Sequence, residues 1–235
     1  QATIIAPALT GLEPQYQAAW TFLERCLVLG LADLADALSL HPYRIDAPES
    51  VTADYQRLRA LLARWSPRQK NIPLISSEWG YSLTWVSPEQ QAAYFVRLYL
   101  LNLLNGLPVS IWYEWRDDGA NTKQIEDNFG LLTRQNQPKP AYHAAQTLVS
   151  ELAGFSLIER VTLPSSTDYA LLFGMGTHRK QVLWTTGQPH TIILSINAPS
   201  ITLTGMTGEI HSQTITRGSL SLTLTGDPQY VTLTH

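Results

Sequence analysis

Over most of its first two thirds, the chain alternates four times between a short apolar segment and a longer amphipathic one. Apolar residues that recur every three or four positions predict helices in the longer segments. Strands that alternate with helices of this length form βαβ units around a parallel sheet. The predicted strands are residues 3–6, 37–40, 73–76 and 109–112, and the predicted helices are residues 15–29, 51–65, 87–105 and 140–152.

Such units give either a doubly wound sheet or part of a barrel, because their crossovers are nearly always right-handed. No glycine-rich phosphate loop follows any of the four strands, so the main signal of a nucleotide-binding sheet is absent from the sequence. Polar and aromatic residues instead follow each strand directly, where the active site of a (β/α) barrel lies. The sequence therefore favours a barrel, and it disfavours a nucleotide-dependent α/β enzyme.

The character of the sequence changes after residue 157, where helical periodicity ends and Ser, Thr and turn residues become frequent. Short strands with turns every 8–12 residues or so are typical of an antiparallel sandwich. We therefore expect a barrel-type domain over residues 1–156 and a small β-sandwich over residues 157–235, packed on the barrel. The predicted strands of the second domain are residues 169–173, 181–185, 191–196, 200–203, 219–224 and 230–234.

Charge and composition exclude several classes of function. The formal net charge is −3, and the sixteen basic residues are scattered, whereas a nucleic-acid-binding surface needs clustered Lys and Arg. No apolar stretch of the sequence reaches the roughly 18 residues that a membrane span needs. The acidic run at residues 117–119 lacks the alternating ligands and closing Glu of a calcium loop. We expect no cofactor, no bound metal, and neither a nucleic-acid nor a membrane partner.

Glu78 follows the third predicted strand and precedes Trp79, Gly80 and Tyr81. A glutamate is seldom buried without a partner, because desolvating its charge costs several kcal/mol. The position suits a catalytic carboxylate at the mouth of a barrel, although a solvated loop glutamate fits the pattern equally well.

Polar residues also follow the two neighbouring strands. His41 and Tyr43 flank a rigid proline after the second strand, where either could hydrogen-bond the carboxylate and keep it ionised and oriented. Trp112 and Trp115 follow the fourth strand and could stack on the apolar face of a sugar ring. A structural histidine and packed core aromatics are the alternatives for these two groups.

Taken together, these strand ends resemble the last three strands of clan A glycoside hydrolases, most closely family 39 and the related family 5 type barrels. The resemblance rests on the order and spacing of short motifs at residues 4–8, 41–43, 78–81, 112–115, 126–131, 139–142 and 226–231. It implies strands 5–8 of a TIM barrel, that is, the C-terminal half, followed by a β-domain. It also implies a retaining glycosidase that acts on a β-linked glycoside or polysaccharide, and a secreted or periplasmic location.

The resemblance further implies a role for individual residues. Glu78 would be the nucleophile, and Tyr43 and His41 would be its hydrogen-bonding neighbours. Trp112 or Trp115 would form the sugar platform. Strand alternation lets only one of Trp112 and Tyr113 point inward, and we favour Trp112. The remaining candidates to line the cleft are Trp79, Tyr81 and Asp118.

One part of the family pattern has no counterpart in this sequence. A retaining glycosidase needs two carboxyl groups about 5–5.5 Å apart, and the family places its general acid/base after an earlier strand. Glu114 and Asp117 are weak substitutes. We therefore expect the acid/base on a missing N-terminal half-barrel and little activity from this chain alone. We expect the chain to be completed by a partner, either that half or a second copy of the chain, unless the sequence is part of a longer enzyme. The alternative is a carbohydrate-binding or scaffolding remnant without catalysis.

Overall fold

The computed structural model of the chain describes residues 2–13, 15–66, 70–215 and 218–234. It divides into two compact units, and each is described by itself. The first comprises residues 1–85 and 97–130, and the second comprises residues 86–96 and 131–235. The domain boundary at residue 156 stays a prediction; a strand begins there.

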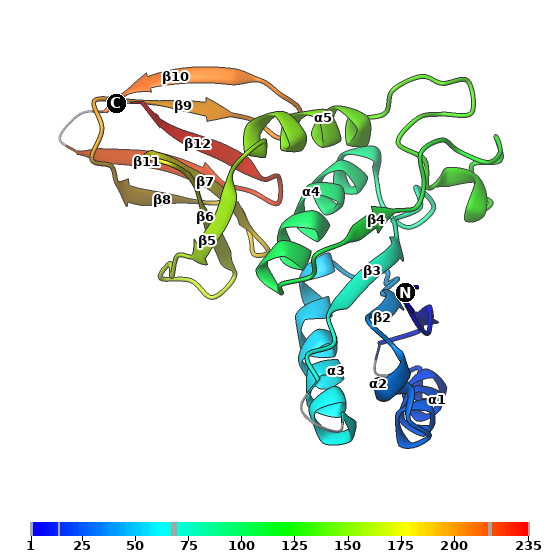
Figure 1. The fold of residues 1–235 in the computed structure, drawn as a ribbon. Helices are drawn as coiled ribbons and strands as arrows, with labels where there is room; N and C mark the ends of the chain where they lie inside the picture. The colour runs from blue at the N-terminus through cyan, green and yellow to red at the C-terminus, as the bar shows by residue number, and fades with distance from the viewer. Residues whose placement is uncertain (1, 14, 67–69, 216–217, 235) are drawn as a thin grey trace. The chain divides into compact units, whose positions relative to one another are not determined.

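The first unit contains a parallel sheet in the strand order β1-β2-β3-β4. Its strands are β1 (Leu9–Thr10), β2 (Leu38–His41), β3 (Leu74–Trp79) and β4 (Ser110–Trp112). Figure 1 labels the last three of these strands. The last three confirm the predictions to within a few residues. The first prediction was wrong in position: near residues 3–6 only Ile5 makes an isolated bridge, to Ala37, and regular pairing starts at Leu9. Pro7 explains the interruption, since proline has no backbone N–H to donate.

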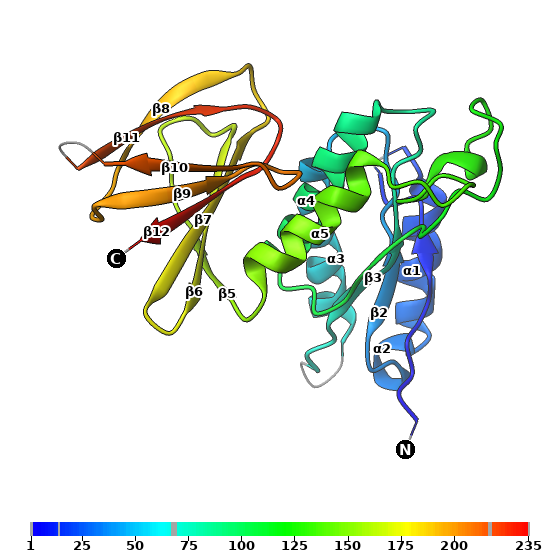
Figure 2. The same cartoon turned by 90° about the horizontal axis from the view of Figure 1, so that it is seen from above.

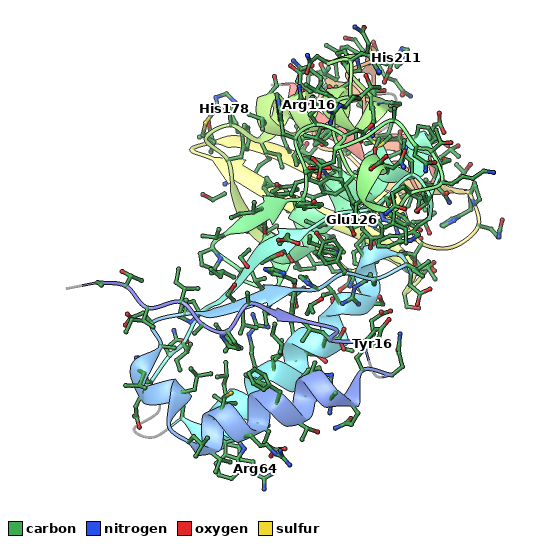
Figure 3. The ribbon with its side chains drawn as sticks, turned by 90° about the vertical axis from the view of Figure 1, so that its right-hand side faces the viewer. Tyr16, Arg64, Arg116, Glu126, His178 and His211 are labelled. Atoms are coloured by element: carbon green, nitrogen blue, oxygen red, sulfur yellow. The ribbon has the colours of Figure 1, made fainter. Side chains whose placement is uncertain are left out.

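The helices follow the predicted periodicity closely. They are α1 (Gln17–Val28), α2 (Leu31–Leu34), α3 (Val51–Trp65), α4 (Pro88–Leu104) and α5 (Pro140–Leu152), with single 3₁₀ turns η1 (Pro48–Ser50) and η3 (Glu126–Asn128). α1 and α3 contact each other and lie side by side against the strands of the first unit (Figure 3). Ser87 caps α4: its Oγ accepts a hydrogen bond from the Gln90 N–H, and its own N–H donates to Gln90 Oε1.

The second unit contains two antiparallel sheets (Figure 2). Six strands lie in the order β10-β9-β12-β7-β6-β5, and β11 pairs with β8. Their bounds are β5 (Ser156–Arg160), β6 (Asp168–Met175), β7 (His178–Thr185), β8 (His190–Ser195), β9 (Ser200–Thr204), β10 (Ile210–Thr214), β11 (Ser219–Leu224) and β12 (Gln229–Thr234). The sequence analysis missed β5 and β10. All five residues of β10 are exposed, so it has no alternation of apolar and polar positions to reveal it.

Both sheets contribute to one apolar core. The six-stranded sheet supplies Ala170, Leu183, Ile201 and Val231, and β11 supplies every second residue, beginning with Leu220. Because each sheet buries its apolar face in this shared cluster, the second unit contains a hydrophobic core of its own.

Candidate active site

Glu78 is the second-to-last residue of β3, beside the carboxyl end of β2. The two strands are parallel and in register, with Leu40 opposite Ser76, so both end at the same edge of the sheet. The pairing of β3 with β4 is irregular between Ser76 and Trp79, the stretch that contains Glu78. Such irregularities redirect side chains and are frequent beside active sites. The backbone therefore presents Glu78 at the edge where β2 delivers its own polar residues.

Tyr43 and His41 both approach the carboxylate. The Tyr43 hydroxyl donates a hydrogen bond of 2.9 Å to Glu78 Oε1, and His41 Nδ1 lies 3.7 Å from the same oxygen. Burial, together with the hydrogen bond and charge of Glu78, raises the pKa of Tyr43, so its hydroxyl stays protonated and remains a donor. The Glu78 side chain is 37% exposed. The carboxylate is thus held from one side and still open to a ligand.

Trp79 and Tyr81 do not line a cleft as expected, because both side chains are fully buried. The Tyr81 hydroxyl donates to the backbone carbonyl of Asp46, and the Trp79 ring lies beneath the Arg44 guanidinium, 5.5 Å from its carbon. Both aromatic residues therefore support the loop after β2 that carries Tyr43. They act on the site through that loop.

Gly80 is a position where the backbone of the site requires a glycine. A Cβ added there would lie 1.8 Å from the backbone carbonyl oxygen of Tyr113 and 3.1 Å from the Phe129 ring. Only a residue without a side chain lets the end of β3 come this close to the segment after β4.

An aromatic cluster surrounds this edge of the sheet. The buried ring of Phe129 makes edge contacts with Tyr43, Tyr113 and Trp85, at centroid distances of 5.8, 5.3 and 5.4 Å. Trp112 is half-buried and donates its Nε1–H to the Phe129 carbonyl. The sequence analysis missed Phe129 and Trp85 and favoured Trp112 over Tyr113. The pKa of Tyr113 is raised by burial first and then by nearby carboxylates that include Glu78, so this ring also borders the site.

The segment after β4 carries three acidic residues with different environments. Asp117 is buried, and its Oδ1 accepts the backbone N–H of Gly130, which closes the loop and argues against Asp117 as the acid/base. Asp118 and Trp115 are exposed. Burial, followed by the charges of Asp118 and Asp117, raises the pKa of Glu114 to about 7. Glu114 Oε1 is buried without a hydrogen-bond partner in the described part of the chain.

The described residues contain no group of three His, Cys, Asp or Glu side chains placed to hold a metal ion. The chemistry available at this edge is that of a carboxylate with tyrosine and histidine neighbours, bordered by aromatic rings.

The sequence matches no family model, and it matches no curated protein. Solved structures are similar. A family 39 glycoside hydrolase from Bacteroides cellulosilyticus WH2 aligns with 91% of this chain at 27% identity and a TM-score of 0.80. The chain has a glycoside hydrolase-like fold.

Two further solved structures agree on this fold. A glucosidase from Croceicoccus marinus matches 99% of the chain at 12% identity, with a TM-score of 0.66. A family 30 endoxylanase from Clostridium papyrosolvens C71 matches all of it at 12% identity, with a TM-score of 0.58. The chain covers only 47%, 60% and 57% of these three structures, respectively, so it spans about half the length of the proteins it resembles.

Proposed function

We propose that this chain is the nucleophile-bearing, C-terminal half of a retaining glycoside hydrolase that acts on a β-linked glycoside or polysaccharide. The observation that carries the proposal is the carboxylate of Glu78 at the carboxyl end of a parallel strand, bound by the Tyr43 hydroxyl at 2.9 Å. The structural likeness to the family 39 enzyme supports it.

In this proposal Glu78 attacks the anomeric carbon while a second carboxyl group protonates the departing glycosidic oxygen. The product is a covalent glycosyl-enzyme. The second carboxylate then takes a proton from water, which attacks the anomeric carbon and releases Glu78. Tyr43 and His41 orient the carboxylate for attack, and Trp112 or Trp115 offers an aromatic face to the sugar.

The second carboxyl group is proposed to lie on the other half of the barrel, either in a partner or in another part of a longer chain. Four βα units cannot close an eight-stranded barrel, and the similar structures are about twice as long as this chain. The two outer strands support this arrangement. Ile4 and Ile5 are exposed beside β1, and Val109 and Ile111 are exposed at β4, so both edges present apolar side chains beside strand backbone that a partner could cover. The proposed architecture is strands 5–8 of a barrel over residues 1–156, followed by a β-sandwich.

Assembly can be tested by sedimentation of the chain with and without a separately produced N-terminal half. We expect the chain alone to self-associate or aggregate, and the two halves to form a stoichiometric complex. Ile111→Lys should prevent that complex. A stable, compact monomer of the chain that does not bind the N-terminal half would refute the proposed partner interaction.

Mechanism-based labelling tests the nucleophile. An activated 2-fluoro glycoside traps the glycosyl-enzyme, so the complete barrel should gain one covalent sugar on Glu78, found by mass spectrometry of peptides. Glu78→Gln should abolish the adduct, whereas Glu159→Gln, a change of the exposed glutamate on β5, should leave it intact. The alternative, a carbohydrate-binding remnant, predicts sugar binding without any adduct even in the complete barrel.

Export from the cell is part of the proposal. Another similar structure, at 12% identity and a TM-score of 0.53, is described as a conserved exported protein from Bacteroides fragilis. Among the residues that the structure describes, no helix combines the length and the apolar character needed to cross a membrane. Detection of the protein in a periplasmic or culture fraction would test the location.

A further inference from the structure

A cavity of about 660 Å³ opens beside the candidate site, within the first unit. Its wall includes Tyr43, the residue that binds Glu78, and it extends over the loop after β1 and the loop after β2. Pockets that enclose a small-molecule ligand measure about 300–1,000 Å³, and this volume is larger than one sugar ring needs. The cavity is therefore continuous with the site and has room for more than one sugar.

Aromatic and apolar side chains form part of its surface. Tyr16 lies before α1 with half of its surface exposed (Figure 3), and Ile45 is exposed on the loop after β2. Trp85 is half-buried, and an edge contact with Phe129 holds its ring. Flat rings that keep one polar end in water suit the mixed surface of a sugar, which has an apolar face and polar edges.

The charged groups of the cavity are acidic. Glu13 and Asp46 line it, and Arg44 is the one cation among the described lining residues. The Arg44 guanidinium already donates hydrogen bonds to the Pro42 carbonyl, to Ser50 Oγ and to Asp54 Oδ2. Its side chain is only 1% exposed. The cavity thus offers a negative surface and no accessible cation, an arrangement that repels carboxylated or sulfated sugars.

We propose that this cavity binds an uncharged oligosaccharide chain that continues beyond the sugar facing Glu78. The inference rests on the proposed glycosidase function and adds its substrate class: neutral glycans with several linked sugars, with uronic-acid glycans excluded. Tyr16 and Trp85 stack on the extra sugars, and Glu13 and Asp46 accept hydrogen bonds from their hydroxyls. Affinity accordingly increases with the number of sugars.

Calorimetric titration of the complete barrel carrying Glu78→Gln tests the inference without any catalysis. The probes are neutral glucose-, mannose- and xylose-based disaccharides and hexasaccharides, with hexagalacturonate as the acidic counterpart of equal length. We expect at least one neutral hexasaccharide to bind tenfold or more tightly than its disaccharide, and hexagalacturonate not to bind. Equal affinity for both lengths, tighter binding of hexagalacturonate, or no binding of any neutral hexasaccharide overturns the proposal.

Matched variants locate the binding surface. Tyr16→Ala should weaken hexasaccharide binding about tenfold, a loss of about 1.4 kcal/mol, and leave the disaccharide unchanged. Trp85→Ala should weaken hexasaccharide binding by a similar factor. Phe22→Ala is the control, because Phe22 lies on α1 with an exposure close to that of Tyr16 but outside the cavity. Unchanged hexasaccharide affinity in Tyr16→Ala, whose exposed ring is not needed for folding, overturns the proposal even if Trp85→Ala misfolds.

The result of the glycan-binding titration can be distinguished from the result of the Glu78 labelling experiment. Absence of an adduct on Glu78 together with length-dependent binding would refute catalysis and keep the glycan-binding cavity. An adduct on Glu78 together with length-independent binding would keep the glycosidase and refute the cavity.

Discussion

The two sheet systems of the chain differ in where their buried apolar residues lie, although both expose some apolar side chains, such as Ile193 on β8. The antiparallel sheets bury apolar residues in a shared core that includes Leu220 and Leu183, both fully buried. The parallel sheet has exposed apolar residues at or beside its outer strands, for example Ile111 on β4 and Ile5 before β1. The antiparallel region has a core of its own, whereas the parallel region carries the candidate chemistry, and in our proposal a further surface covers its edges.

The largest effect should come from the shared core. Leu220→Ala removes buried methyl groups and leaves a cavity between the two sheets, so we expect the free energy of unfolding to fall by about 2–5 kcal/mol. Denaturant unfolding followed by tryptophan fluorescence measures the change. Ile193→Ala is the control on the paired strand β8, since that side chain is 78% exposed, and it should change stability by about 0.5 kcal/mol or less. Equal losses in the two variants would contradict a core shared by both sheets.

A smaller effect, of a different kind, should follow from Tyr43→Phe at the edge of the parallel sheet. This change removes the donor to Glu78 Oε1, and a hydrogen bond to a charged group is worth about 1.5–3 kcal/mol. We expect the rate of 2-fluoro glycoside labelling in the complete barrel to fall about 10–100-fold, with little change in unfolding. Tyr142→Phe, a change of a tyrosine on α5 that is not a member of the cluster, is the control. A labelling rate within about twofold of the original would show that the bond does not orient the carboxylate.

The sequence predicted those features that depend on local pattern. The bounds of α3 and α5 agree with their periodicity. Tyr43 bonds Glu78 as expected, because adjacent parallel strands end at one edge. The burial of Trp79 and Tyr81 was not predictable, since it depends on Arg44 and on the loop after β2, which are more than 30 residues away.

Residues that reach the site through tertiary packing escaped the sequence analysis for the same reason. Phe129 lies 86 residues after Tyr43 and meets it only in the folded chain. No motif at Phe129 distinguishes its ring from any other core aromatic. The irregular pairing around Glu78 is equally invisible, because it depends on how β4 meets β3.

A third prediction uses Glu114 to test the cost of burying charge in the parallel region. Its pKa is raised from 4.5 to about 7, so between these values the folded chain retains a proton that the unfolded chain releases. The free energy of unfolding should therefore fall as the pH rises from 4.5 to 7, and then level off. Glu114→Gln should flatten this dependence, whereas Glu159→Gln should preserve it. An identical pH dependence in Glu114→Gln would show that Glu114 is ionised throughout.

The smallest effect should come from a charge pair in the antiparallel region. His190 on β8 lies 3.0 Å from the buried carboxylate of Asp168 on β6 and thus links the two sheets. A backbone hydrogen bond to the Gln188 carbonyl, followed by the bond to Asp168, raises the pKa of His190 above 6.5. The pair therefore stabilises the fold fully below pH 6.5, and its contribution is lost as the pH rises through the raised pKa.

His190→Gln tests this directly, because glutamine can hydrogen-bond but cannot gain a charge. We expect the variant to lose stability at low pH and to match the original chain at high pH, with a small difference because the histidine is partly exposed. His178→Gln, at the start of β7, is the control. The stability change caused by Glu114 falls between pH 4.5 and 7, and the change caused by His190 falls above pH 6.5. Unfolding of the two variants measured over both pH ranges therefore assigns each loss of stability to its own sheet system.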